Sequence, residues 1–574
     1  ETQSILKDVE AAADELSGQS SIVYENSVNA EGFDVLDEYY TLCTEKLNAL
    51  NDAVGAVRQQ MQSLERCDAP KTEKGKAVEA EQKAYFEDAL EVIGGIQEAL
   101  IFYTAQYDAL QPLVTATVGD QQAYLISVYE AAGNVKTALS TLDTPEWLND
   151  LWPKYVANLD VMTKYMESRS WGLAWSDVLR LYSANQLISR VGITSGRHEE
   201  TMFDLYSREY NHAAFLLDEN LDAYADEILA ACEGGKDVGA YDAQAPIVFS
   251  DYSTVEEIFP NLYPSMDSAI NLLLYTDKGY TDVMVTAEIA GFTQKYEQKV
   301  TLTPEMTYLM IKPPVLADMP DLSTTKDTQM TLRVENTITG EAIIQETKNI
   351  ELHSVYDYKN YSDEFGIIQN DNILAWMTPE TDGILQVRRN AVSWLEQSFG
   401  TEYGMLPGYQ PAYGFTSDQG AYITYYQVAA IQSAISNMGV RYNMGPYSFS
   451  ASQRVLMPDA VLENGSGICI ETAVLMASVL ESASMHAMIV FTPGHAQTAV
   501  ETWSGSGQYF LIETTMLPFT ATQDALQSLI QPLSAEEWAN YLYNKEQEAQ
   551  QSGGMVYVVD CDLAPVLNIQ GLNY

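Results

Sequence analysis

Hydrophobic residues in the first part of the chain recur with the period of an α-helix. From Phe33 they are spaced alternately by three and four residues, which is the heptad pattern of a long helix with one apolar seam. This first seam comprises Leu36, Tyr40, Cys43, Leu47, Leu50, Val54, Val57, Met61 and Leu64. A second seam comprises Phe86, Ala89, Ile93, Ile96, Leu100, Tyr103, Tyr107 and Leu110. The connection between the seams is short and polar, so the pattern predicts an antiparallel helical hairpin.

Other helical patterns surround this hairpin. They cover residues 5–18, 121–142, 146–166, 175–191 and 199–232. We therefore expect residues 1–235 to form an elongated all-α helical bundle. The two seams should pack against each other within one chain, and the protein is predicted to be a monomer.

After Gly234 and Gly235 the hydrophobic pattern changes to the two-residue alternation of β-strands. Apolar and polar residues alternate over 283–289 and 330–334. Further strand patterns, separated by turn residues, cover 294–302, 307–311 and 342–352. Short strands at such intervals predict an antiparallel, Ig-like β-sandwich over residues 246–356.

Helical and strand patterns are mixed in the last part of the chain, residues 371–574. Helices are expected at 381–397, 421–438, 535–551 and from Cys469 onward, and strands at 486–492, 509–514, 555–559 and from His495 onward. This mixture predicts an α+β domain. The final strand is expected to pair with the sheet that carries His495.

A cysteine stands at the start of one of these helices. Cys469 follows the flexible run Asn464-Gly465-Ser466-Gly467 and opens an apolar segment with helical spacing. The positive end of the helix dipole and the unpaired N–H groups favour a thiolate there. The same N–H groups can bind an oxyanion. Glu471, in the same first turn, is expected to complement the helix dipole and not to react.

A histidine and a glutamate are placed to join this cysteine. His495 leads a strand, the turn at 503–507 is rich in Gly and Ser, and Glu513 lies in the returning strand, 509–514. A hairpin centred near Ser504 would place His495 and Glu513 opposite each other. A turn shifted by one or two residues would make them diagonal neighbours, which a Glu side chain can still bridge. Nucleophile, base and orienting acid can then converge.

Three segments carry a resemblance to a known family. They read GSGICIETAVLMASVLE around Cys469, PGHA around His495 and FLIETT around Glu513. They resemble the bacterial, transglutaminase-like branch of the papain-fold cysteine enzymes, in which a Gln-Arg-Val…Pro segment precedes the cysteine helix and a β-sandwich precedes the enzyme domain. The resemblance implies that Cys469 is the nucleophile, His495 the general base and Glu513 the acid that orients the imidazole. The wider superfamily usually has Asp at the third position.

The second oxyanion donor is less well defined by the sequence. Tyr442, Tyr447, Gln453 and Arg454 all precede the cysteine and carry donor groups. Gln453 also matches the family segment and is the predicted donor, with a loop-bracing role as the alternative. Neither a cofactor nor a metal is predicted, because Cys469, His495 and Glu513 are three mixed ligands without a Cys-x-x-Cys pair.

Charge and cysteine content limit the classes of partner and the locations that are expected for this protein. The chain has 80 acidic and 30 basic residues, a net charge of −50, which repels nucleic acid and anionic membrane surfaces. No apolar run is long enough for a membrane helix, so no membrane insertion is predicted. The five cysteines are too scattered for a disulfide framework. Acidity with abundant Tyr, Asn, Gln and Ser favours an extracellular or cell-surface protein of a bacterium, with any export signal or anchor absent from this chain.

Together these patterns predict an enzyme that performs acyl transfer at an amide or peptide carbonyl of a protein or peptide substrate. A thioester on Cys469 resolved by water would make it a peptidase or amidase, and one resolved by a lysine amine a transglutaminase. The alternative is a non-catalytic cell-surface binding or scaffolding protein that retains the transglutaminase-like fold.

Overall fold

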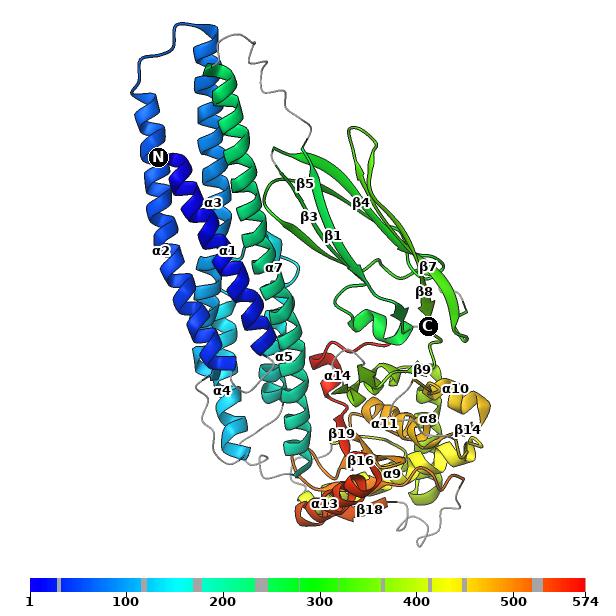
Figure 1. The fold of residues 1–574 in the computed structure, drawn as a ribbon. Helices are drawn as coiled ribbons and strands as arrows, with labels where there is room; N and C mark the ends of the chain where they lie inside the picture. The colour runs from blue at the N-terminus through cyan, green and yellow to red at the C-terminus, as the bar shows by residue number, and fades with distance from the viewer. Residues whose placement is uncertain are drawn as a thin grey trace.

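The structure is a computed structural model of the chain. It describes residues 1–27, 32–114, 121–168, 178–232, 246–277, 279–318, 321–362, 367–410, 416–445, 452–518 and 530–572. Long helices run side by side along one flank of the molecule, two β-sheets lie beside α7, and a mixed α/β region lies at one end of both (Figure 1).

The N-terminal region is helical. Its elements are α1 (Thr2–Ser27), α2 (Gly32–Glu65), α3 (Glu73–Val114), α4 (Gln121–Leu139), η1 (Glu146–Leu148), α5 (Trp152–Ser168) and α7 (Val178–Cys232). The two predicted seams contact each other, since the rings of Tyr40 and Tyr107 stack with centroids 4.6 Å apart. Gln97 Nε2 also donates to Asn51 Oδ1 at 2.8 Å. The predicted contact between the seams is confirmed within the chain.

Several helix boundaries differ from prediction. The helix expected at 5–18 is longer and runs over Thr2–Ser27 as α1. The stretch 146–166 is divided into η1 and α5, because Pro153 lacks an N–H and is accommodated only in the first turn of a helix. Conversely, the predicted helices 175–191 and 199–232 are one helix, α7, of 55 residues. Gly192 and Gly196 lie inside α7, where each glycine lowers the stability of the helix by about 1 kcal/mol relative to alanine. Buried residues such as Val191 on either side keep the helix continuous.

Two sheets follow the helices and share one hydrophobic core. The first has the strand order β1 (Val248–Thr254), β3 (Ile270–Thr276), β6 (Thr307–Ile311), and the second β2 (Glu257–Ile258), β8 (Ala342–Leu352), β7 (Lys326–Asn336), β4 (Thr281–Ile289), β5 (Tyr296–Leu302). In β4 every second residue is buried, as the alternation predicted. One pair departs from the antiparallel prediction, because β2 runs parallel to β8.

The C-terminal region contains a five-stranded antiparallel sheet. Its order is β18 (Ile530–Leu533), β17 (Tyr509–Ile512), β16 (His495–Glu501), β15 (Ala487–Thr492), β19 (Tyr557–Asp560). The last strand therefore pairs within this sheet, as predicted. Short strand pairs and 3-10 turns also lie in the later part of the chain, namely β9 (Asp357–Tyr358), β10 (Tyr361–Ser362), β11 (Ile367–Ile368), η3 (Asn370–Trp376), η4 (Thr401–Tyr403), β12 (Arg441–Tyr442), β13 (Gln453–Arg454) and β14 (Ser466–Gly467).

Helices α11 (Cys469–Ser482) and α13 (Ala535–Ser552) cover the two faces of this sheet. The other helices of the region are α8 (Asp382–Phe399), α9 (Ser417–Asn437), α10 (Pro458–Asn464) and α14 (Leu563–Val566). On one face Thr498 Oγ1 donates to Ala473 O of α11 at 3.0 Å. On the other face the preceding residue, Gln497, accepts a 2.6 Å hydrogen bond from Tyr541 of α13. The sheet thus lies between α11 and α13 and positions residues of β16 toward both.

Within the described residues, no helix combines the length and apolar character required to cross a membrane. Many buried apolar side chains of the helical region belong to a core that also includes residues of the C-terminal region.

Candidate active site

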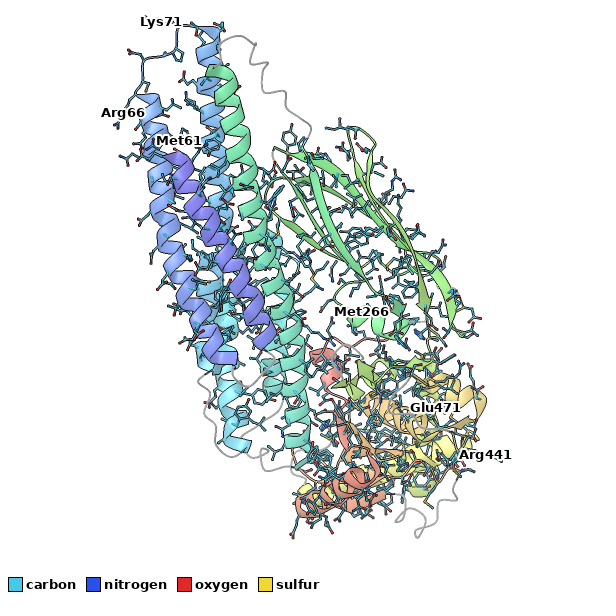
Figure 2. All side chains as sticks on the ribbon, viewed as in Figure 1. Met61, Arg66, Lys71, Met266, Arg441 and Glu471 are labelled. Atoms are coloured by element: carbon cyan, nitrogen blue, oxygen red, sulfur yellow. The ribbon has the colours of Figure 1, made fainter. Side chains whose placement is uncertain are left out.

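Cys469 is the first residue of α11 and is buried, with 6% of its surface exposed. The start of the helix is fixed by Glu471, whose two carboxylate oxygens accept from Ile468 N and Leu456 N, each at 2.8 Å. Figure 2 shows Glu471 among the side chains of the C-terminal region, far from Arg66 and Lys71 at the distal end of the helical region. Glu471 therefore braces the cysteine turn, which fits the non-reactive role expected for it.

His495 is the first residue of β16, and Glu513 directly follows the neighbouring strand β17. Their side chains meet, with His495 Nε2 3.1 Å from Glu513 Oε2. Thr498 pairs with Ile512, so the next position outward places Gln497 opposite Glu513 and makes His495 its diagonal neighbour. The prediction that the hairpin is centred near Ser504 is therefore wrong by one residue. The alternative prediction, a turn shifted by one or two residues with His495 and Glu513 as diagonal neighbours, is confirmed.

Glu513 is held by several donors. Its Oε2 also accepts from Gln497 Nε2 at 2.9 Å, and its Oε1 accepts from Thr515 N at 2.9 Å. Burial raises the pKa of Glu513, but the hydrogen bonds from His495 and Thr515 outweigh burial and bring the pKa to about 2. Glu513 is therefore a carboxylate at neutral pH and faces His495 in a fixed orientation.

His495 connects this carboxylate to the cysteine. The neighbouring thiol of Cys469 and then the hydrogen bond with Glu513 raise the pKa of His495 to about 9, against the opposing effect of burial. Because Nε2 faces Glu513, Nδ1 is the ring nitrogen left for the Cys469 sulfur. An imidazolium between a thiol group and a carboxylate stabilises the thiolate. The structure thus brings together all three residues that the sequence placed in the site.

Tyr442 lies beside these residues. Its strand β12 runs parallel to β14, the segment just before Cys469, with Tyr442 paired to Gly467. Burial raises the pKa of Tyr442, and the charges of Cys469 and Glu513 raise it further. Of the four donor candidates named from the sequence, Tyr442 is thus placed within electrostatic reach of both groups.

The other donor candidates are placed differently. Gln453 is buried in β13, which pairs with Tyr358 of β9, and its role as an oxyanion donor stays a prediction. Arg454 lies over the ring of Tyr356, 4.6 Å from its centroid. Tyr447 lies outside the described residues. The strand that bears Gln453 and Arg454 therefore also joins the site region to the segment that follows the two sheets.

Sequence reasoning did not single out two residues that support the triad. Gln497 donates to Glu513 and accepts from Tyr541, so the hydrogen-bonded series runs from α13 through Gln497 and Glu513 to His495. The alternation of β16 already placed Gln497 on the same face as His495, and the correct hairpin register would have identified it. No sequence pattern indicated Tyr541, because it lies 44 residues away from Gln497 along the chain.

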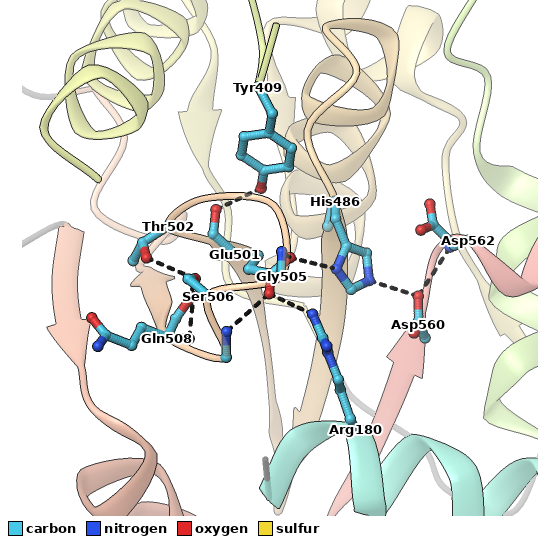
Figure 3. Close-up of polar contacts among 12 residues, drawn as sticks. Arg180, Tyr409, His486, Glu501, Thr502, Gly505, Ser506, Gln508, Asp560 and Asp562 are labelled. Carbon is cyan, nitrogen blue, oxygen red and sulfur yellow. Dashed lines mark hydrogen bonds and ion pairs between the residues drawn. The ribbon is translucent and has the colours of Figure 1, made fainter. Parts of the chain in front are cut away.

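A second buried polar cluster lies where α7 meets this domain (Figure 3). His486 Nε2 is 2.8 Å from Asp560 Oδ1, and His486 Nδ1 is 3.7 Å from Glu501 Oε2. Arg180 of α7 donates to Glu501 Oε1 at 2.5 Å. Ligand atoms of His486, Asp560 and Asp562 lie within 4.8 Å of one another, a spacing that suits a metal ion. Here the charges already pair with one another, and the guanidinium of Arg180 disfavours a further cation.

Comparison of the chain with protein-family models, curated proteins and solved structures finds no match.

Proposed function

We propose that residues 371–574 form a papain-like, transglutaminase-like cysteine enzyme domain that transfers acyl groups from an amide or peptide carbonyl. One observation carries the proposal: Cys469, at a helix start, lies close enough to His495 to raise the pKa of its imidazole, and Nε2 of the same imidazole faces the carboxylate of Glu513. Nucleophile, base and orienting acid in this order are the arrangement that cysteine acyl transfer requires.

In the proposed reaction, the Cys469 thiolate attacks the carbonyl carbon and forms a carbon–sulfur bond. The N–H groups at the start of α11 stabilise the negative charge on the carbonyl oxygen. The carbon–nitrogen bond then breaks, and the His495 imidazolium gives its proton to the leaving amine. His495, now neutral, removes a proton from water or from an amine, which attacks the thioester and releases Cys469 as thiolate. Water gives hydrolysis and an amine gives transamidation.

The rest of the chain is interpreted on the same proposal. The two sheets that share a core are assigned to an Ig-like β-sandwich, and the N-terminal helices to a bundle that serves as a spacer or docking module. The proposed substrate is a protein or peptide. The proposed location is the surface of a bacterium or the extracellular space. Support comes from the net charge of −50, which disfavours nucleic acid and anionic membranes and also disfavours close approach of a second copy.

Selective alkylation tests the proposal. Iodoacetamide at pH 6 to 7 is expected to label Cys469 ahead of the other cysteines, because it lies at a helix start beside His495, the arrangement that activates a cysteine nucleophile. Burial raises the pKa of Cys43 to about 12, so that thiol should stay unmodified in the folded protein. Peptide mapping by mass spectrometry identifies the labelled residue. Equal labelling of all cysteines, or none at Cys469, would favour the non-catalytic scaffolding alternative.

Replacement of Glu513, which is hydrogen-bonded to His495, is predicted to change the pH dependence of Cys469 alkylation. Glu513→Gln removes the second group that raises the pKa of His495, so that pKa should fall from about 9. Because the imidazolium then deprotonates at lower pH, the rate of Cys469 alkylation should respond to pH over a shifted window. We expect Glu513→Gln to reduce acyl transfer by roughly 10²- to 10⁴-fold, less than loss of the nucleophile.

Gln497→Leu should shift the same window by a smaller amount and reduce activity by roughly tenfold, because Gln497 positions Glu513 without touching the substrate. Gln531→Leu, an exposed position on the neighbouring strand β18, is the matched control and should leave the profile unchanged. An unaltered profile in Gln497→Leu would show that Glu513 is positioned without it.

A further inference from the structure

The hairpin of β16 and β17 has a buried carboxylate that holds its turn. Glu501 is the last residue of β16 and is 2% exposed. Its Oε2 accepts from Gly505 N at 3.1 Å, and its Oε1 accepts from Gly507 N at 3.0 Å. Both glycines have positive φ, a conformation in which nearby backbone N–H groups can converge on an anion. The carboxylate of Glu501 therefore fixes the conformation of the loop 502–508.

Helix α7 supplies a positive charge that keeps this carboxylate in place (Figure 3). Arg180 is 3% exposed, and its Nη2 donates to Glu501 Oε1 at 2.5 Å. His486 Nδ1 lies 3.7 Å from Glu501 Oε2. Burial raises the pKa of Glu501, but the contacts with His486 and Arg180 and the hydrogen bond from Gly507 outweigh burial and lower that pKa. Glu501 is therefore ionised at neutral pH and links the helical region to the turn.

The turn determines how β16 and β17 align. The ladder between these strands comprises four residue pairs. In so short a hairpin the geometry of the turn sets the register, and a shift of one residue turns each side chain to the other face of the sheet. The observed register is the one that makes His495 the diagonal neighbour of Glu513. The anchor at Glu501 and the contact between His495 and Glu513 therefore depend on the same alignment.

His495 and Glu501 lie at opposite ends of β16. Positions 495 and 501 are six residues apart, which is roughly 20 Å along a strand, so Glu501 lies away from the reacting groups. Displacement of a reacting group by about 1 Å can nevertheless lower a rate by about 100-fold. A change in the turn can therefore alter the contact between His495 and Glu513 although no residue of the site is replaced.

We propose that Glu501 and Arg180 are positioning residues for the triad. By docking onto the hairpin, α7 fixes the register that joins His495 to Glu513. This inference rests on the proposed cysteine chemistry at Cys469, because that chemistry requires the imidazole and the carboxylate to be aligned. It gives the helical region a part in the activity beyond that of a spacer or docking module. Removal of the anchor should lower acyl transfer by roughly 10- to 100-fold.

The pH dependence of Cys469 alkylation by iodoacetamide tests the proposal in the full-length protein. The informative variant combines Arg180→Met with Glu501→Leu, which removes both buried charges and so limits the loss of stability. Leucine cannot accept from the two glycine N–H groups, so the turn loses its anchor. We expect the pH window of alkylation to shift in the same direction as in Glu513→Gln, because the hydrogen bond from this glutamate that raises the pKa of His495 is weakened. A purely structural role would leave the window of the folded variant unchanged.

Further variants make the test specific. Arg190→Met removes a different contact of α7 with the C-terminal region, the ion pair with Asp371, and is the matched control whose window should stay unchanged. Adding Glu513→Gln to the double variant should shift the window no further than Glu513→Gln alone, because both changes act through the same contact. Hydrogen exchange of residues 502–508 should rise in the double variant and not in Arg190→Met. Glu501→Gln keeps the size of the side chain without its charge, and it supplies the same measurements if the double variant does not fold.

The proposal is supported if the pH window and the hydrogen exchange of the turn change in the double variant and not in Arg190→Met. An unchanged window in the folded double variant, or an equal shift in Arg190→Met, would overturn it, while selective labelling of Cys469 in the wild type would still support the proposed function. A wild-type protein in which Cys469 is not labelled selectively would overturn the proposed function itself, and this inference with it.

Discussion

Replacement of Cys469 by alanine is expected to abolish acyl transfer, with a loss of roughly 10⁴-fold or more relative to the wild-type protein. No thioester can form without the sulfur, and the thiol group that most raises the pKa of His495 disappears with it. The assay combines denatured casein with a fluorescent primary amine. Release of peptides reports hydrolysis, and incorporation of the amine reports transamidation.

Cys561→Ala is the matched control for this experiment. Cys561 is also buried in the C-terminal region, but it follows β19 and is not part of the triad. This variant should keep its activity even where its stability falls. Wild-type activity that survives in Cys469→Ala would exclude Cys469 as the nucleophile.

The second large effect is expected at the contact between α7 and the sheet that bears the triad. Arg180 and Glu501 are 3% and 2% exposed, and Arg180 Nη2 lies 2.5 Å from Glu501 Oε1. Arg180→Ala leaves a buried carboxylate without the permanently charged one of its two basic partners, the other being His486, which costs about 3–5 kcal/mol. For a unit of this size, the unfolding midpoint of the C-terminal region should fall by roughly 10 °C. Differential scanning calorimetry of the full chain measures the change.

Two comparisons interpret the Arg180 result. Lys545→Ala removes an exposed partner of Glu548 and should change the free energy of unfolding by less than about 1 kcal/mol. Arg180→Met combined with Glu501→Leu removes both charges and should recover much of the stability lost by either alone. If the double variant is as unstable as Arg180→Ala, the contact is held by packing and not by charge.

Local patterns predicted the elements of this chain well. The heptad seams identified α2 and α3, and the two-residue alternation identified β4, because both patterns follow from burial of one face of an element. The length of α7 was missed, since glycines that end a helix and glycines tolerated inside one look alike in sequence.

The candidate site could be predicted because its residues come from consecutive elements. Cys469 begins a helix, and His495 and Glu513 lie on one hairpin, so only a short-range register had to be inferred. The contacts that support the site could not be found in this way. Arg180 and Glu501 are 321 residues apart, and no periodicity in either segment indicates the other.

Helix α7 also constrains how the chain can evolve. At 1.5 Å per residue it is about 80 Å long, and it contacts the other regions at Arg180, Arg190, His198 and Arg208. Insertion or deletion of one residue between two of these positions would rotate everything beyond it by about 100°, so the later contacts would face the wrong way. Related chains should therefore vary in length in the loops while keeping the spacing from residue 180 to residue 208 constant.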